Sequence, residues 1–331
     1  MNSADSVTLF HLQTLTAILL GDVRLGLMRT QFIRTVTKRL DSFHAASYFS
    51  PFVAAELENI GLSRHAHYFA SRGCALGWAS AELVASTFFP FNPDLVAQVV
   101  PDCWDAASPK RVHEARLTGV RALASSLASS AASQESGARS SALEQAAVRV
   151  RRNLAPVIEA QSVSGRALYA AHRSALSEEY AQSGSDDPLF ALWVTTTLLR
   201  EFRGDGHVAA LVSHGLSGID ASVLDCATGR AWRPSSARKS RGWSDVEWRV
   251  TAAELSARGL LTDESDLAEL TDSGMQLREH IEAATDASVE SAWAAVSDDA
   301  LAELRDDAKL IAEAVAAAHL IPQKLFGRES S

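Results

Sequence analysis

The sequence predicts a mainly α-helical protein, with a helical N-terminal domain followed by a smaller helical domain that carries a β-hairpin. Alanine, leucine and serine dominate, and aromatic residues make up only 7% of the 331 residues. Apolar side chains recur every three or four residues through the first half, which is typical of amphipathic helices. With 47% apolar and 21% charged residues, the chain has the composition of a soluble globular protein and the length for two domains.

Residues 1–28 precede the first clear helical pattern, so we expect them to be disordered or an upstream extension, with Met28 as an alternative start. Residues 29–182 should form the helical domain, which would offer a ligand-binding or dimer surface. The first helix is predicted from Arg29 to Tyr48. A second begins at Ser50 and Pro51, an N-cap followed by proline at the first helical position, and ends at Gly61.

Further helices are expected along the rest of the first half. The segments "NPDLVAQVV" and "SPKRVHEARL" open with the same pairing of a capping residue and proline. Helices are also predicted over 142–155 and 156–180, after a loop at 133–138. Clustered turn formers at 183–188 end this half of the chain.

The second half begins with a helix from Pro188 to about Arg203. In the stretch "LREFRGDGHVAAL", Gly204 should end that helix, and Asp205 should be the N-cap of a new helix that His207 opens. A basic loop is expected at 228–242. It is followed by a helix whose Ser244 and Glu247 form a capping box, a hairpin at 262–269, and a helix capped by Thr271. Residues 287–331 should form acidic C-terminal helices.

The order of elements from Ser244 to Asp286 resembles the recognition helix, wing and following helix of MarR-like winged-helix proteins. The resemblance implies a winged helix-turn-helix domain over 188–286, in a dimeric, DNA-binding transcription regulator. The helix beginning at Ser244 would lie in the major groove. The wing departs from the pattern, because its tip reads "TDESD" and would repel phosphate.

The basic loop and the helix after it supply the candidate DNA contacts within residues 228–258. Basic residues with interleaved tryptophans can hold phosphates, although a flexible solvated insertion would have the same composition. The candidate residues are Arg230, Arg233, Arg238, Lys239, Arg241, Trp243 and Arg249.

From about His44 to Asp286 the chain is similar to an actinobacterial family of helix-turn-helix proteins. The segments that carry the similarity are "HAASYFSP", "YFASRGCALG", "ASTFFPFNP", "LREFRGDGHVAAL" and "RGWSDVEW". This resemblance strengthens the fold prediction and implies no particular reaction. It also directs attention to the first half, where several of these segments lie.

Those first-half segments place polar groups among aromatic side chains, a mixture that lines small-molecule pockets and also occurs in ordinary cores. The candidate ligand-binding residues are Tyr48, Tyr68, Arg72, Phe88, Asn92, Arg203 and Asp205. If the chain is instead an enzyme or a small-molecule-binding protein of specialised metabolism, His44 and His207 are the candidate acid and base.

Composition and motifs exclude several classes of function. The net charge is −9, and residues after 262 hold 16 acidic against 5 basic side chains, so the whole chain is not an electrostatic nucleic-acid binder. The three cysteines lack CxxC spacing, and His65 and His67 would point to different helix faces, so we expect no metal and no cofactor. No apolar run is long enough to span a membrane, and a cytoplasmic protein is expected.

Two interpretations therefore remain. The first is a ligand-responsive, MarR-like regulator that binds DNA as a homodimer through residues 228–258. The second is an enzyme or binding protein that uses the same scaffold without DNA.

Overall fold

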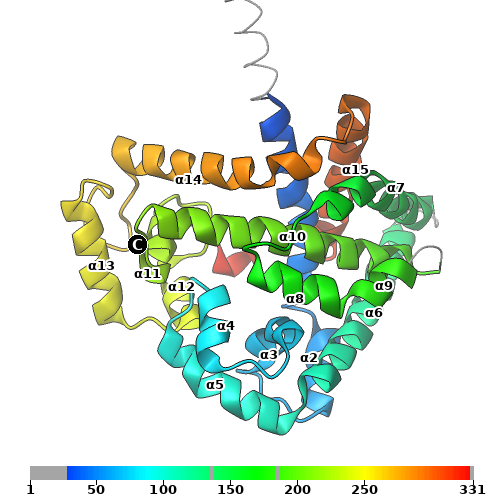
Figure 1. Cartoon of the computed structure of the whole chain (residues 1–331), viewed down its shortest axis with the longest axis horizontal. Helices are drawn as coiled ribbons and strands as arrows, with labels where there is room; N and C mark the ends of the chain where they lie inside the picture. The colour runs from blue at the N-terminus through cyan, green and yellow to red at the C-terminus, as the bar shows by residue number, and fades with distance from the viewer. Residues whose placement is uncertain (1–27, 135–137, 183–185, 329–331) are drawn as a thin grey trace, which may run out of the picture.

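The computed structural model describes residues 28–134, 138–182 and 186–328, and every regular element in these ranges is a helix (Figure 1). The helical class is confirmed. The predictions for residues 1–27, 135–137, 183–185 and 329–331 lie outside the described residues. The helices are residues 28–46, α2 (Pro51–Asn59), α3 (His67–Gly73), η1 (Cys74–Leu76), α4 (Ala81–Thr87), α5 (Pro93–Ala106), α6 (Pro109–Gln134), α7 (Ala138–Ala160), α8 (Ala167–Ala175), α9 (Ser177–Gln182), α10 (Pro188–Ser213), α11 (Gly218–Cys226), α12 (Pro234–Arg241), α13 (Asp245–Ala257), α14 (Asp272–Glu290), η2 (Ser291–Trp293), α15 (Asp298–Ala317) and η3 (Gln323–Leu325).

Helix α10 is the central element of the fold. Every side chain from Leu189 to Leu199 is buried, so this part of the helix is enclosed on all sides rather than on one face. It packs against α6, α7, α8, α9 and α14, and the helix of residues 28–46 crosses behind it (Figure 1). All other parts of the molecule are therefore positioned relative to α10.

The predicted break at Gly204 is wrong, because α10 runs without interruption through Gly204, Asp205 and Gly206. Gly206 faces α14 so closely that a Cβ atom would lie 2.2 Å from the Ser288 hydroxyl. The Asp205 carboxylate accepts a hydrogen bond from the backbone N–H of Tyr169, 2.9 Å away, and so caps the start of α8 rather than a new helix. Packing against two neighbours thus overrides the local helix-ending signal.

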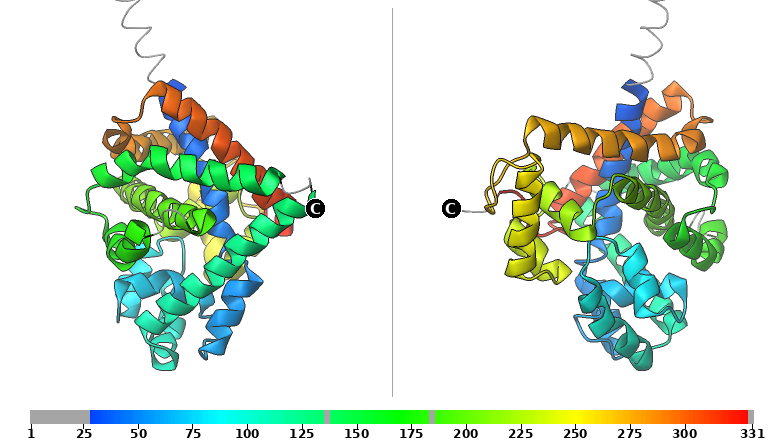
Figure 2. Two further views of the ribbon diagram at one scale, coloured as in Figure 1. Left: turned by 90° about the vertical axis from the view of Figure 1, so that its right-hand side faces the viewer. Right: turned by 60° about the vertical axis from the view of Figure 1, so that its left-hand side comes forward.

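The buried apolar side chains form two clusters. The larger takes in the helices up to Phe202 together with residues 289–315, and the smaller spans residues 210–281 and includes Trp248 and Leu255. Both α10 and α14 contribute side chains to each cluster, and α14 lies along α10 in the two views of Figure 2. The unit formed by α11, α12 and α13 is therefore joined to the helical body by two continuous helices.

Most predicted helix starts are confirmed by their caps. Ser50, Asn92 and Thr271 each accept a backbone hydrogen bond at the start of α2, α5 and α14. Ser244 and Glu247 form the predicted capping box of α13. The sequence predicts these helix starts because each capping side chain accepts a hydrogen bond from a backbone N–H in the first turn of its own helix.

Two loops or breaks predicted from the sequence are helical instead. Helix α7 continues through Pro156, where Leu154 and Val157 are fully buried and their packing offsets the cost of an internal proline. Within the expected basic loop of 228–242, residues Pro234–Arg241 form α12. Ala237 on α12 is fully buried, which anchors this strongly basic segment.

The predicted two-stranded wing is not present among the described residues. Leu261 and Leu270 form a single antiparallel bridge, and the Thr262 N–H donates to the Glu269 carbonyl. Beyond that point Asp263 and Ser265 accept hydrogen bonds from backbone N–H groups two residues ahead of them. These local turns occupy the donors that a strand ladder would need.

Two glycines in long helices should respond oppositely to alanine. A Cβ atom at Gly119 of α6 would lie 2.5 Å from the Val53 Cα atom of α2, whereas one at Gly204 would meet only the Glu201 carboxylate at 3.9 Å. Gly119→Ala should lower the free energy of unfolding by about 1–3 kcal/mol through overpacking. Gly204→Ala should raise it by up to about 1 kcal/mol through helix propensity. Urea unfolding followed by circular dichroism measures both, and equal effects of the two substitutions would contradict the close α2–α6 contact.

Candidate functional site

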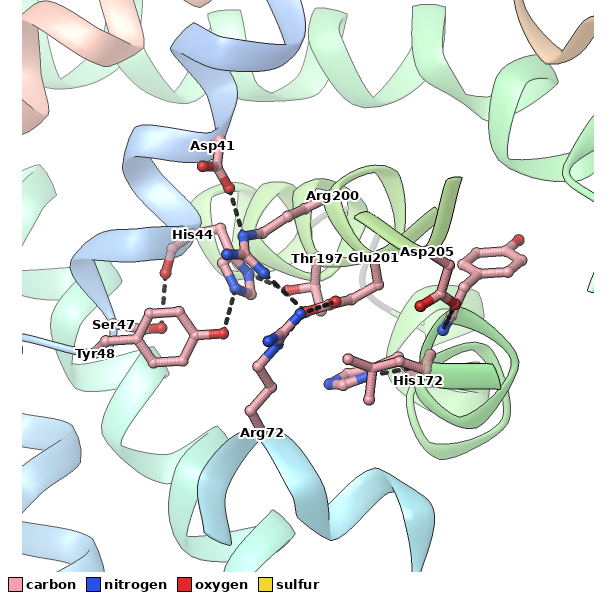
Figure 3. Close-up of polar contacts among 12 residues, drawn as sticks. Asp41, His44, Ser47, Tyr48, Arg72, His172, Thr197, Arg200, Glu201 and Asp205 are labelled. Carbon is pink, nitrogen blue, oxygen red and sulfur yellow. Dashed lines mark hydrogen bonds and ion pairs between the residues drawn. The ribbon is translucent and has the colours of Figure 1, made fainter. Parts of the chain in front are cut away.

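A buried carboxylate on α10 holds two guanidinium groups. Glu201 is fully buried and accepts hydrogen bonds from Arg72 at 2.9 and 2.6 Å, a bidentate pair between α3 and α10. Arg200 lies 3.1 Å from the same carboxylate (Figure 3). Burial alone would raise the pKa of Glu201, but the two neighbouring cations hold it well below its usual range. Glu201 is therefore a permanent anion in the protein interior.

Arg200 also connects α10 to the first helix. Its Nε atom lies 2.8 Å from the Asp41 carboxylate, and its guanidinium lies 5.9 Å from the centre of the Tyr48 ring. Burial raises the pKa of Tyr48 to about 12, so its hydroxyl stays protonated and available as a donor.

The tautomer of His44 follows from its partners. The Thr197 hydroxyl donates to the Trp193 carbonyl at 2.8 Å, so it can only accept from His44 Nδ1, also at 2.8 Å. His44 Nε2 then accepts from the Tyr48 hydroxyl at 2.8 Å. Burial lowers the pKa of His44 well below its ordinary value, so the ring is neutral. With both nitrogens engaged and no exposed surface, neither can take a proton from a substrate in this arrangement.

A second buried histidine is fixed in the same tautomer. His172 Nδ1 donates to the Leu168 carbonyl at 3.0 Å, so Nε2 accepts from Arg116 at 3.3 Å. Burial lowers the pKa of His172 to about 4. Arg116 is itself buried and lies over the Trp193 ring at 4.8 Å. A largely buried network thus reaches from the first helix through α10 to α6 and α8, with the Trp193 ring between His44 and Arg116. Its buried members are His44, Arg72, Arg116, His172, Thr197 and Glu201, and its partly exposed members are Asp41, Tyr48 and Arg200.

The network continues through aromatic side chains to the connection between α4 and α5. Arg72 lies 4.8 Å from the centre of the Phe88 ring. Tyr68, which accepts a hydrogen bond from Arg72 at 3.3 Å, packs against Phe88 and Phe91. Pro90 and Asn92, the residues next to these two phenylalanines, contact the unit formed by α11, α12 and α13.

That contact fastens the turn between α12 and α13. The Asn92 N–H donates to the Arg241 carbonyl at 2.8 Å, and the Asn92 side chain donates to the Gly242 carbonyl at 3.1 Å. The Trp243 indole donates to the Pro90 carbonyl at 3.0 Å. A Cβ atom at Gly218, at the start of α11, would lie 2.0 Å from the Phe89 carbonyl oxygen, so only glycine permits this approach.

The segment that begins at Arg203 forms a second connection, from α10 to α14. Arg203 pairs with Glu282 at 2.7 Å and with Asp286 at 3.1 Å. Asp286 also pairs with Arg34 of the first helix at 2.5 Å. His207 Nδ1 donates to the Thr285 hydroxyl at 3.0 Å, since that hydroxyl donates to the Ile281 carbonyl. Polar contacts thus fasten α14 to α10 and to the first helix.

Helices α12 and α13 form a helix-turn-helix. Gly242 ends α12 in the left-handed conformation, with φ 76°, and Ser244 caps α13 two residues later. A short turn containing glycine between two helices is typical of this motif, in which the second helix presents its N-terminal residues to DNA. Helix α13 lies at the outer edge of the molecule (Figure 1), and its inner face is held by Trp248 and Leu255.

The candidate DNA contacts divide into exposed and engaged residues. Arg230, Lys239 and Arg249 are exposed. Arg238 forms a bidentate pair with Asp266 at 2.6 and 2.9 Å and an ion pair with Asp245. The remaining three are partly buried and hydrogen-bonded inside the protein, namely Arg233 to the Phe326 carbonyl, Arg241 to Ser222 and Trp243 to Pro90.

The structure separates the candidate ligand-binding residues into two groups. Tyr48, Tyr68, Arg72 and Phe88 lie together around the buried network, and Asn92 is at its end beside the turn. Arg203 and Asp205 lie further along α10 and face α14 and α8. His207 follows Thr197, the partner of His44, by ten residues, which is about 15 Å along a helix axis. His44 and His207 are therefore not brought together.

Two small cavities in the described part of the chain lie away from these residues. One, of about 50 Å³, is lined by Leu127, Leu143 and Leu310, and the other, of about 20 Å³, lies beside Cys226 and Leu267. Both are smaller than a site for a drug-sized molecule. The aromatic residues around Arg72 pack against one another, with ring centres 4.8 to 5.6 Å apart.

The described residues contain no group of three His, Cys, Asp or Glu side chains placed to hold a metal ion. None of the helices in the described ranges combines the length and the apolar character of a membrane span.

Comparison with known proteins places the chain in a family. The model of the helix-turn-helix family matches residues 33–322, so the chain belongs to this helix-turn-helix family. The match takes in the buried network as well as α12 and α13. No curated protein and no solved structure matches the chain.

Neutralising Glu201 should strongly destabilise the protein. Glu201→Gln leaves the buried Arg72 guanidinium without its anionic partner, and the loss of one member of a buried pair costs about 3–5 kcal/mol. Urea unfolding measures the change. The matched control is Glu58→Gln, which breaks the exposed Arg64–Glu58 pair and should cost less than about 1 kcal/mol. Equal costs at the two positions would contradict the role of Glu201.

Stability should fall between pH 6.5 and 4.5. His44, His172 and His207 have lowered pKa values in the folded protein because burial disfavours their charged forms, whereas the unfolded chain titrates near 6.5. The unfolded state then binds more protons, so stability is lost as the pH falls, by about 1.4 kcal/mol per pH unit for each fully titrating histidine. Urea unfolding at several pH values measures this slope, and a stability that rises on acidification would contradict the neutral assignments.

Proposed function

We propose that this protein is a DNA-binding regulator in which α13 enters the major groove. The observation that carries the proposal is the α12–turn–α13 unit, with its left-handed Gly242 and its outward-facing α13, in a chain that belongs to a helix-turn-helix family. The helical body fixes the position of the unit through Pro90 and Asn92.

We further propose that the domain carrying α13 has a MarR-like arrangement of helices. The order α11, α12, α13, acidic turn, α14 supports a MarR-like helix-turn-helix domain over residues 188–286 in which the acidic turn stands in the place of the two-stranded wing, beside a helical domain over 29–182 and followed by the C-terminal helices. The turn at 262–269 carries Asp263, Glu264 and Asp266, so it stays away from phosphates. The backbone contacts fall instead to Arg230 and Lys239, with Arg249 on α13 itself. Each chain has one such unit, so a homodimer would read two half-sites.

A response to a small molecule would act through the connection between α4 and α5. Phe88 and Phe91 of this connection contact Arg72 and Tyr68, while Asn92 holds the turn of the helix-turn-helix. A ligand that separated the aromatic rings would shift Asn92 and so move α13. Because these rings are closely packed, such a ligand must open the cluster, and its affinity would include that cost.

The test is selection of binding sites from a random duplex library with the full chain at low salt. One sequence class should be enriched, with an affinity well above that for unrelated DNA. Arg249→Ala should lower that affinity by about five- to 150-fold, because a bidentate arginine–guanine contact is worth about 1–3 kcal/mol. Since few cations face the DNA, affinity should fall with salt with a log–log slope of about −2 to −3 for each unit.

The matched control is Arg152→Ala, which removes an exposed arginine of α7 that pairs with Glu303. This variant should bind as the parent chain does. No enrichment at any salt concentration, or equal losses for the two arginine variants, would overturn the proposed function.

A further inference from the structure

The outward face of α13 is apolar where it would meet a partner. Val246 is 62% exposed and Val250 is 53% exposed, four residues apart on one face of the helix, and Ala253 follows on the same face. Trp248 and Leu255 on the opposite face of α13 are buried in the core. Val246 and Val250 therefore lie outside the core that holds this helix. Two exposed valines on a well-anchored helix therefore form an apolar surface that no described residue covers.

The acidic residues in the first turn of α13 are engaged elsewhere. Asp245 pairs with Arg238 at 2.9 Å. The Glu247 carboxylate accepts from the Ser244 N–H at 2.8 Å and lies 3.4 Å from the Asn92 amide. Arg249 is exposed between the two valines, three residues after the first, and its Nε atom donates to the Asp245 carbonyl. The face thus presents two valines and one cation in its first two turns, and the exposed Glu254 follows Val250 by one turn.

We propose that α13 recognises thymine-containing sequence, with Val246 and Val250 contacting the C5-methyl groups of thymines next to a guanine read by Arg249. This proposal rests on the proposed function and specifies which base edges the helix reads. In the major groove the thymine methyl is the apolar feature, and guanine O6 and N7 are the acceptors that an arginine bonds. An apolar pair beside a cation matches that combination of base edges.

Charge favours duplex DNA over a protein as the occupant of this face. Lys239 on α12 and Arg230 in the connection before it are exposed, and α12 is the helix that crosses the phosphate backbone in this motif. The acidic turn at 262–269 adds no backbone contacts, so sequence preference depends on the few side chains of α13. Those side chains are Val246, Arg249 and Val250.

The experiment uses the full chain and a duplex selected as described above, with each thymine of the site replaced in turn by uracil. Uracil lacks only the C5-methyl group, so hydrogen bonding and charge stay the same. We expect the affinity to fall roughly fourfold at each contacted thymine, the factor that burial of one methyl-sized group contributes. Titration followed by fluorescence anisotropy measures the affinities.

Variants of the chain assign the effect to residues. Val246→Ala should bind the thymine and uracil duplexes equally at one position, and Val250→Ala should do so at another. Val212→Ala is the matched control, because Val212 is 58% exposed near the end of α10, and this variant should discriminate as the parent chain does.

Three outcomes would overturn the inference. If the selected DNA binds but uracil changes nothing, the thymine contacts are wrong while the proposed function stands. If no DNA is enriched, both fail. If Val246→Ala leaves DNA discrimination intact and instead changes the sedimentation coefficient of the chain, the face joins two copies of the protein.

Discussion

The ion pair between Glu201 and Arg72 is the interaction on which the rest of this structure depends. It joins α3 to the central helix α10 inside the protein, where the carboxylate is fully buried and the guanidinium nearly so. Arg200 adds a second cation and extends the pairing to Asp41 of the first helix. A buried ion pair gives little net stability compared with apolar packing, but separating its members leaves a buried charge without a partner. We infer that its main effect is to fix how three helices meet.

Two sets of contacts connect the helices around Glu201 to the helix-turn-helix. One passes from Arg72 through the phenylalanines between α4 and α5 to Asn92, which holds the turn before α13. The other follows α10 itself, where Arg203 pairs with residues of α14. Since α10 and α14 belong to both hydrophobic clusters, α13 is presented on a rigid body rather than on a linker. This arrangement is consistent with the proposed role of α13, in which the helical body sets the position of the helix on DNA.

The sequence predicted features that depend on neighbouring residues and missed those that depend on distant ones. Caps such as Ser244 with Glu247 act within one helical turn and were found. The continuation of α10 through Gly204 depends on α8 and α14, which no local pattern reveals. Arg72 and His44 were singled out, but their partners Glu201 and Thr197 were not. The sequence could have predicted that Glu201 is buried and paired, because it lies in a helix that is apolar on every side. The wing was predicted from a hairpin at 262–269 and from the MarR-like order of elements, whereas Asp263 and Ser265 accept hydrogen bonds from backbone N–H groups in local turns.

Hydrogen exchange of the full chain, with and without a bound duplex selected from a random library, tests the account most directly. The account predicts that DNA slows exchange in α12 and α13, over residues 234–257, and leaves the acidic turn at 262–269 unchanged. The buried helices around Glu201 should exchange slowly in both states. Protection confined to the acidic turn or to the first helices, with α13 unchanged, would contradict the assignment of α13 as the DNA-reading helix.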